Sequence, residues 1–377
     1  MFTRSLARIW TAAALALVLL TTAGCVGAGS SPGGDNGNAG GGGTQADTAQ
    51  KQVIRFGDMQ WQSLWVNNAI AGFIIEKGYG YPVETVEVTT PIMQVSLLRG
   101  DLDVALEIWT GNMVDWYTEV TESGRLLDLG KVMDRTTQGW YVPAYVVKGD
   151  PDRSIAPMAP DLKSVEDLKR YATLFADPEE PGKGLLLNCI TGWDCANVNR
   201  VKLHAYGLAD LYNVQEPGSS GALDAAIAGA YQRGQPLLTY YWEPTWLMGA
   251  LDMILLEEPP YTEECWALVR QGVAGEIPLD QTPPEAGCAF EDAPVIKGVH
   301  PSLKERAPEV VAFLEKMMIP TATLNQIANY MEENEAEADE AALWFFANYP
   351  ALWRAWLPDD VAERVEEALT ESGVSLR

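Results

Sequence analysis

The sequence predicts an α/β fold with two lobes and a ligand-binding cleft between them. Short strand-like runs alternate with longer amphipathic segments along most of the 377 residues, which is the signature of an α/β protein. The alternation occurs twice, over residues 52–109 and again over residues 164–246. Two such units in one chain of this length indicate two lobes, and clefts between lobes are favoured ligand sites.

The first unit contains strand and helix patterns in strict alternation. Apolar spacing and turn residues predict, in order, a strand at 52–61, a helix at 63–80, a strand at 82–88, a helix at 90–100 and a strand at 101–109. The last strand delivers Glu107 and Trp109 to its carboxyl end. Open α/β sheets bind their ligands beyond the carboxyl ends of the strands. We therefore expect these two residues near the cleft.

The second unit repeats this logic and a helical region follows it. A buried strand at 236–240 runs directly into the aromatic cluster YYWEPTW. After residue 300, helical patterns cover 301–317 and 321–357. Aromatic residues recur there at helical spacing, and we expect them to pack between helices: Trp344, Phe345, Phe346, Trp353 and Trp356.

The N-terminus resembles a secretory signal. Arg4 and Arg8 precede an apolar run at 9–20, which is shorter than the roughly 20 residues that span a bilayer. Small residues then lead into Cys25, as in the lipobox of bacterial lipoproteins, although Thr22 stands where leucine is usual. An ordinary signal peptide with an incidental cysteine is the alternative. We expect a membrane-anchored, extracytoplasmic lipoprotein.

The domain boundaries follow from composition. We expect a signal peptide at 1–24, a lipidated cysteine with a disordered Gly-rich tether at 25–50, lobe 1 at 51–147, lobe 2 at 148–289, and a return to lobe 1 with C-terminal helices at 290–377. The tether has too few large apolar residues to order itself. No later stretch is long and apolar enough for a second membrane span.

Four cysteines remain if Cys25 carries lipid, and an oxidising compartment favours pairing them. Three pairings are possible. We expect the local one, Cys189 with Cys195 and Cys265 with Cys288. The cysteines form no CxxC pair, and the two histidines have no nearby partners, so we expect neither a metal site nor a cofactor.

The charge is strongly acidic, with 52 Asp and Glu against 26 Lys and Arg. This balance argues against nucleic acid or an anionic lipid surface as a partner and is compatible with a cationic ligand. Three tryptophans stand beside turn-forming residues where strands end, namely Trp109, Trp193 and Trp242. They either converge on one cleft or pack locally, each under its own loop.

Several motifs, in order, resemble the substrate-binding proteins of glycine betaine/choline ABC transporters: IRFGDMQW, GDLDVALEIW, TQGWYVPAYVV, NCITGWDCAN and YYWEPTW. The resemblance runs from Gln52 to the helical tail. It implies a type II-like periplasmic-binding-protein fold. It also implies a monomer that closes over a quaternary ammonium ligand, passes it to a membrane ABC permease and has no enzymatic activity. The family's aromatic box falls on Trp109, Trp193 and Trp242, with the disulfide-bridged loop as one wall.

Such a box is suited to a trimethylammonium group, which donates no hydrogen bond and is held by ring faces. At the polar end of the ligand, Met113 replaces the family's histidine. Asn112 and the backbone amides of Asp194 and Cys195 are the candidates there. Glu107 and Glu243 add negative potential, which favours choline while leaving glycine betaine open. Further candidates for lining the cleft are Trp140, Tyr141, Trp61 and Trp65.

Two other functions are also compatible with these residues. Aromatic platforms also suit sugars, so a carbohydrate-binding protein or a glycoside hydrolase is one, with Glu107 and Glu243 as the only candidate carboxylate pair. A ligand-sensing lipoprotein is the other. From residue 51 onward, the sequence lacks G-x-S-x-G, H-E-x-x-H and P-loop motifs, so we expect no enzyme.

Overall fold

The computed structural model describes residues 51–376, which contain two five-stranded sheets. The first sheet has the strand order β2-β1-β3-β10-β4 and comprises β2 (Val83–Glu87), β1 (Ile54–Asp58), β3 (Val104–Trp109), β10 (Val295–Val299) and β4 (Leu127–Lys131). The second has the order β7-β6-β8-β5-β9 and comprises β7 (Tyr212–Gln215), β6 (Gly184–Leu187), β8 (Leu238–Glu243), β5 (Thr137–Pro143) and β9 (Met253–Leu255). The proposed lipidated Cys25, the signal peptide and the tether lie outside the described residues.

The two sheets share one topology. In the first, β1 pairs in parallel with β2 and β3, and β10 lies antiparallel between β3 and β4. In the second, β6 pairs in parallel with β7 and β8, and β5 lies antiparallel between β8 and β9. Each sheet therefore contains one antiparallel strand contributed by a distant part of the chain.

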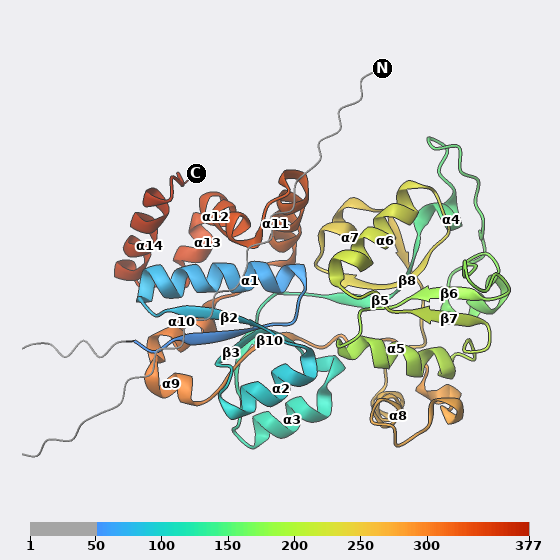
Figure 1. Ribbon diagram of the computed structural model, residues 1–377, viewed down its shortest axis with the longest axis horizontal. Coiled ribbons are helices and arrows are strands. Elements are labelled where there is room, and N and C mark those ends of the chain that lie inside the picture. The colour runs from blue at the N-terminus through green and yellow to red at the C-terminus, as the bar shows by residue number, and fades with distance from the viewer. Residues whose placement is uncertain (1–50, 377) are drawn as a thin grey trace, which may run out of the picture. The chain divides into compact units, whose positions relative to one another are not determined.

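Helices cover both faces of each sheet (Figure 1). On the first sheet, α1 (Gln62–Phe73), continued by a π-helix (Ile74–Tyr79), covers one face, and α2 (Thr90–Arg99) and α3 (Val114–Glu122) cover the other. On the second, α6 (Ser220–Gln232) and α7 (Trp246–Ala250) cover one face, and α5 (Asp194–Ala205) and α8 (Glu263–Val273) cover the other. A short helix, α4 (Ala144–Lys148), follows β5. Central strands are buried on both faces, as in β3, where all but the last residue are buried.

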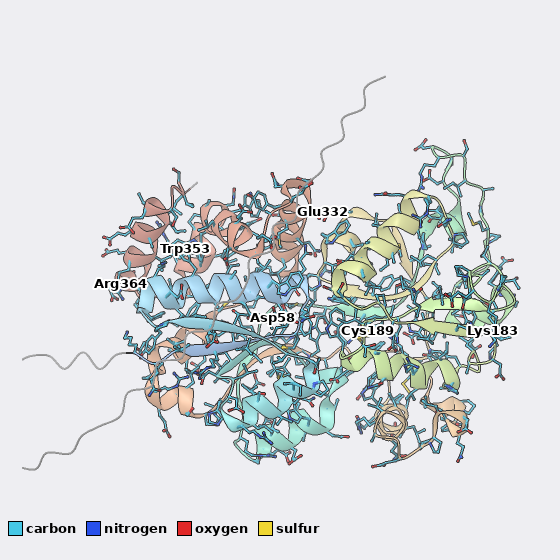
Figure 2. The ribbon with its side chains drawn as sticks, in the orientation of Figure 1. Asp58, Lys183, Cys189, Glu332, Trp353 and Arg364 are labelled. Carbon is cyan, nitrogen blue, oxygen red and sulfur yellow. A yellow bond between two sulfur atoms is a disulfide. The ribbon has the colours of Figure 1, made fainter. Side chains whose placement is uncertain are left out.

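The C-terminal region is helical. It comprises α9 (Ser302–Arg306), α10 (Pro308–Lys316), α11 (Thr321–Asn334), α12 (Ala338–Asn348), α13 (Pro350–Arg354) and α14 (Asp359–Glu371). Of these, α11 and α12 pack against α1. The expected aromatic packing is confirmed: Phe345, Phe346 and Trp353 are fully buried, and Trp344 stacks on Tyr330. Figure 2 shows Trp353 among these helices.

Some predicted elements differ from the observed ones. The strand expected at 236–240 is observed as Leu238–Glu243, so it includes Trp242 instead of ending before it. The helix expected at 301–317 breaks at Ala307 because Pro308 disfavours a helical conformation in the preceding residue. The second unit begins with a short 3₁₀ helix at Val165–Arg170.

The chain leaves the first sheet after Lys131 and returns to it at Val295. The lobe boundaries at 147 and 289 stay predictions. Over the described part of the chain, no helix has the length and apolar character needed to cross a membrane.

Candidate functional site

An aromatic cavity lies where elements of the two sheets meet. Its free volume is about 40 Å³. Four indole rings and one phenol ring account for most of its wall. The twelve lining residues are Trp61, Thr90, Met93, Glu107, Trp109, Asn112, Met113, Trp193, Asp194, Cys195, Tyr240 and Trp242.

Strand ends position the rings. Trp109 is the last residue of β3, and Trp61 follows β1 at the start of α1. Tyr240 is the third residue and Trp242 the fifth of the six in β8, so the two lie on one face of the strand. Trp193 immediately precedes α5, which follows β6. The four indole rings thus lie at the carboxyl ends of parallel strands, where α/β sheets bind ligands.

Trp193 is in edge-to-face contact with two other indoles. The ring centroids of Trp61 and Trp193 are 5.6 Å apart at 87°, and those of Trp193 and Trp242 are 5.2 Å apart at 88°. Trp61 belongs to the first sheet's elements, and the other two belong to the second's. The tryptophans therefore converge, and the alternative that each packs alone under its loop is excluded.

Trp193 is held from both sides. Its loop is closed by a disulfide between Cys189 and Cys195, and its indole Nε1 donates a hydrogen bond of 2.8 Å to the carbonyl oxygen of Met59. Figure 2 labels Cys189 and Asp58, which mark the two chain segments that the hydrogen bond from Trp193 to Met59 joins. Only 7% of Trp193 is exposed, so the ring is fixed before any ligand enters.

The second expected disulfide, Cys265 with Cys288, is also present, so the predicted local pairing is confirmed. It links α8 to the chain segment preceding β10. Within residues 51–376, His, Cys, Asp and Glu side chains form no group of three that could hold a metal ion.

Glu107 anchors the rings of the first sheet's side. Its Oε2 accepts hydrogen bonds from Trp61 Nε1 at 2.6 Å and Ser63 Oγ at 3.1 Å, and its Oε1 accepts one from Asn67 Nδ2 at 2.8 Å. The Trp109 side chain also hydrogen-bonds to it. Burial raises the pKa of Glu107, while these donors oppose the increase. The carboxyl group is therefore occupied in holding two rings.

The polar end of the cavity contains Asn112, Met113, Asp194 and Cys195. Asn112 is engaged with Gln138, whose Nε2 donates to Asn112 Oδ1 at 3.1 Å. Asp194 is the first residue of α5, and its Oδ2 is buried with no hydrogen-bond partner among the described residues. Burial raises the pKa of Asp194 to about 6.

Some sequence-predicted candidates lie outside this lining. Trp140 is fully buried, donates from Nε1 to Asn199 Oδ1 at 2.8 Å and packs its ring on Tyr206, because strand alternation turns it toward α5. The hydroxyl group of Tyr141 instead contacts Thr137 Oγ1 at 3.2 Å. Glu243, the last residue of β8, accepts a hydrogen bond from that same Thr137 hydroxyl at 3.3 Å.

Trp65 also lies outside the lining, because its Nε1 donates to Asp58 at 2.9 Å. Since Glu243 does not line the cavity, Glu107 and Glu243 do not form a carboxylate pair there.

The sequence analysis ranked Trp61 below the box residues and missed three lining residues, Tyr240, Thr90 and Met93. The position of Trp61 just after a strand and the two-residue spacing of Tyr240 from Trp242 were the available signals.

Comparisons with known proteins identify the family of the chain. Residues 52–348 match the OpuAC family, described as the substrate binding domain of ABC-type glycine betaine transport system. The chain is 24% identical over 306 residues to the trimethylamine N-oxide-binding protein of Pelagibacter ubique (strain HTCC1062), covering 80% of this chain and 90% of that protein.

Solved structures show the same fold. A glycine betaine, L-proline ABC transporter binding protein (ProX) from Borrelia burgdorferi superposes with a TM-score of 0.63 at 18% identity, covering 83% of this chain and 99% of that one. An ABC-transporter choline binding protein in complex with choline gives a TM-score of 0.63 at 18% identity, covering 84% and 98%. These likenesses show the predicted type II periplasmic-binding-protein fold. The chain belongs to the family of substrate-binding domains of ABC-type glycine betaine transport systems, and is thus an extracytoplasmic binding protein of an importer and not an enzyme.

Proposed function

We propose that the aromatic cavity binds the trimethylammonium group of a small ligand, with Trp61, Trp109, Trp193, Trp242 and Tyr240 as its walls. The observation that carries this proposal is the convergence of Trp61, Trp193 and Trp242, with centroid separations of 5.6 and 5.2 Å, on one cavity. A methylated cation is attracted by the negative faces of such rings.

The energetics support a cage of several rings. Each ring contributes about 0.5 to 2 kcal/mol toward a cation, and most when water is excluded. Micromolar affinity requires about 8 kcal/mol. Several rings together with the burial of three methyl groups reach this range, provided that the rings need no ordering on binding. The disulfide-closed loop and the hydrogen bonds on Trp61 and Trp193 supply that rigidity.

The relatives narrow the ligand class. The names of the two similar binding proteins mention trimethylamine N-oxide and choline, and the family description mentions glycine betaine. All three compounds carry a positively charged nitrogen with three methyl groups. The cage addresses this shared group, so we propose a small trimethylammonium-type solute as the substrate.

Binding also joins the two lobes, which we propose to be built on the first and on the second sheet, so that β5, before residue 147, belongs to the second. The cavity takes its walls from elements of both sheets. Hydrogen bonds cross between them, from Thr90 N to the carbonyl oxygen of Gly192 at 3.2 Å and from Trp246 N to Gln62 Oε1 at 3.3 Å. A ligand held by rings from both sides favours the closed arrangement through contacts that the open one lacks. The closed form then delivers the ligand to a membrane permease.

We also propose that Cys25 carries a lipid that keeps the protein at the membrane surface. The support is the lipobox-like run of small residues before it. Mass spectrometry of the membrane-extracted protein checks this point. The expected result is a mature chain that starts at an acylated Cys25, and a chain cleaved elsewhere contradicts it.

Calorimetric titration tests the ligand class. We expect choline, glycine betaine or trimethylamine N-oxide to bind with micromolar or tighter affinity, and a disaccharide to give no heat. Trp193→Ala should weaken binding tenfold or more. Trp344→Ala is the matched control, because Trp344 stacks on Tyr330 and does not line the cavity. Absence of binding by every trimethylammonium compound, or equal affinity of wild type and Trp193→Ala, contradicts the proposal.

A further inference from the structure

Asp194 presents an acceptor that the protein does not use. It lines the aromatic cavity between Trp193 and Cys195, and its Oδ2 is buried without a hydrogen-bond partner among the described residues. Buried carboxylates are normally paired or hydrogen-bonded, because an unsatisfied one is costly. A free acceptor in the wall of a binding cavity is therefore a position for a donor on the ligand.

The rest of the lining offers no competing role for this oxygen. Of the twelve lining residues, only Glu107 and Asp194 carry an ionisable carboxyl group, and none is basic. Glu107 is occupied by Trp61, Ser63 and Asn67. Asp194 is thus the carboxyl group in this lining with acceptor capacity to spare.

The same arrangement is unfavourable for an anionic ligand end. A ligand carboxylate would approach Asp194 with no Lys, Arg or His in the lining to neutralise either group. The backbone amides at the start of α5 can donate to an anion, but the Asp194 carboxylate already lies beside them. Met113, close by, contributes no charge and no strong donor.

We propose that Asp194 is a specificity-determining residue, which accepts a hydrogen bond from a hydroxyl group at the far end of the ligand. The site then prefers a trimethylammonium alcohol of the choline type over a trimethylammonium carboxylate of the betaine type. This inference rests on the proposed function of the cavity. It adds the kind of chemical group at the far end of the ligand, which the aromatic cage does not recognise.

Three ligands test the aromatic cage and the polar end of the site separately. Tetramethylammonium reports on the cage alone, choline adds a hydroxyl group, and glycine betaine adds a carboxylate. Wild type should bind choline at least tenfold more tightly than glycine betaine at pH 7.5. Asp194→Asn should lower the ratio of choline to tetramethylammonium affinity at least fivefold. It should also strengthen glycine betaine binding at least threefold.

Two further variants keep the test interpretable. Asp194→Gly removes the side chain altogether and should strengthen glycine betaine binding at least as much. Asp359→Asn is the matched control, because Asp359 is an exposed first residue of α14 and lies outside the cavity. It should leave all three affinities unchanged.

Tighter binding of glycine betaine than of choline by wild type, or an unchanged ratio of choline to tetramethylammonium in Asp194→Asn, overturns the role of Asp194 while leaving the cage intact. Failure of all three ligands to bind wild type overturns the proposed function itself.

Discussion

The indole nitrogen of Trp193 donates a 2.8 Å hydrogen bond to the backbone carbonyl oxygen of Met59. This bond joins the loop before α5, which belongs to the second sheet, to the segment that follows β1 in the first. The same indole contacts the rings of Trp61 and Trp242. One side chain therefore both forms a wall of the cavity and links the two halves that enclose it.

This double role predicts a graded response at Trp193. Trp193→Phe keeps an aromatic face but loses the indole N–H, so the bond to Met59 disappears. We expect ligand affinity to fall about three- to tenfold, which is less than for Trp193→Ala, since cation attraction is also weaker for Phe than for Trp. Isothermal titration with choline measures the difference. If Phe and Ala substitutions weaken binding equally, the retained ring contributes nothing and the prediction is wrong.

Removing each disulfide in turn should distinguish effects on folding stability from effects on ligand affinity. On the chain-entropy model, removing Cys189–Cys195 costs about 2 kcal/mol of folding free energy, and removing Cys265–Cys288 costs about 3 to 4 kcal/mol. Only the first bridge closes the loop that carries Trp193. We expect the Cys189→Ser, Cys195→Ser variant to lose affinity at least fivefold. The Cys265→Ser, Cys288→Ser variant serves as the control and should bind nearly as wild type while melting at a lower temperature. The reverse ranking of affinities would contradict the role of the loop.

Glu107 should act on binding through the rings that it holds. Glu107→Gln replaces one acceptor oxygen by an NH₂ group, which then faces Trp61, Ser63 or Asn67, all of which are donors. We expect three- to tenfold weaker binding of tetramethylammonium, together with a changed tryptophan emission spectrum in the ligand-free protein. Unchanged affinity and emission would show that the carboxylate does not position the indoles.

The pH dependence of binding should follow Asp194, whose pKa burial raises to about 6. The other titratable groups in the lining are Glu107 on β3 and Tyr240 on β8, and burial raises the pKa of both. On the packed α8, Arg270 is paired with Asp115 and Glu263, and on α5 itself Lys202 is paired with Glu258. None of these pairs involves Asp194.

Above pH 6, the ionised carboxylate accepts the hydroxyl group of choline. One pH unit below the pKa, about a tenth of the molecules remain ionised, so choline affinity should be about tenfold lower at pH 5 than at pH 7.5. Glycine betaine should change in the opposite direction, because a protonated Asp194 can donate to its carboxylate. Titrations across this range with wild type and Asp194→Asn make the comparison. Parallel pH profiles for the two proteins would contradict this assignment.

The titration of Asp194 should also change the free energy of unfolding of the ligand-free protein. The pKa of Asp194 is higher in the folded state, about 6, than its ordinary value of 3.8, so its contribution favours folding at low pH and is lost as pH rises through 6. Asp194→Asn should therefore be more stable than wild type at pH 8, by up to about 3 kcal/mol, and close to it in stability near pH 4. Urea unfolding at both pH values measures this, with Asp359→Asn as the control. A difference that is independent of pH would contradict it.

Strand ends and the family resemblance together allowed much of the site to be predicted from sequence. Trp109, Trp193 and Trp242 each stand where a strand gives way to a turn, and the resemblance implied that they form one box. All three line the cavity. Glu107 shares a strand face with Trp109 two residues on, which also placed it correctly at the cavity.

The remaining features depend on how elements pack against each other. Thr90 and Met93 reach the cavity only because α2 packs where the second sheet's loop meets it, which no local pattern encodes. Trp140 was a further candidate for lining the cleft, yet it lies in the middle of β5 and donates its indole N–H to a buried partner on α5, Asn199. The choice between a cavity wall and a core position is made by tertiary packing, and a single sequence does not reveal it.

The most direct measurement is a crystal structure of the protein bound to choline. The account predicts that the quaternary nitrogen lies within about 6 Å of the ring centroids of Trp61, Trp193 and Trp242, with the hydroxyl oxygen in hydrogen-bond distance of Asp194. A quaternary nitrogen located outside these three rings would contradict it.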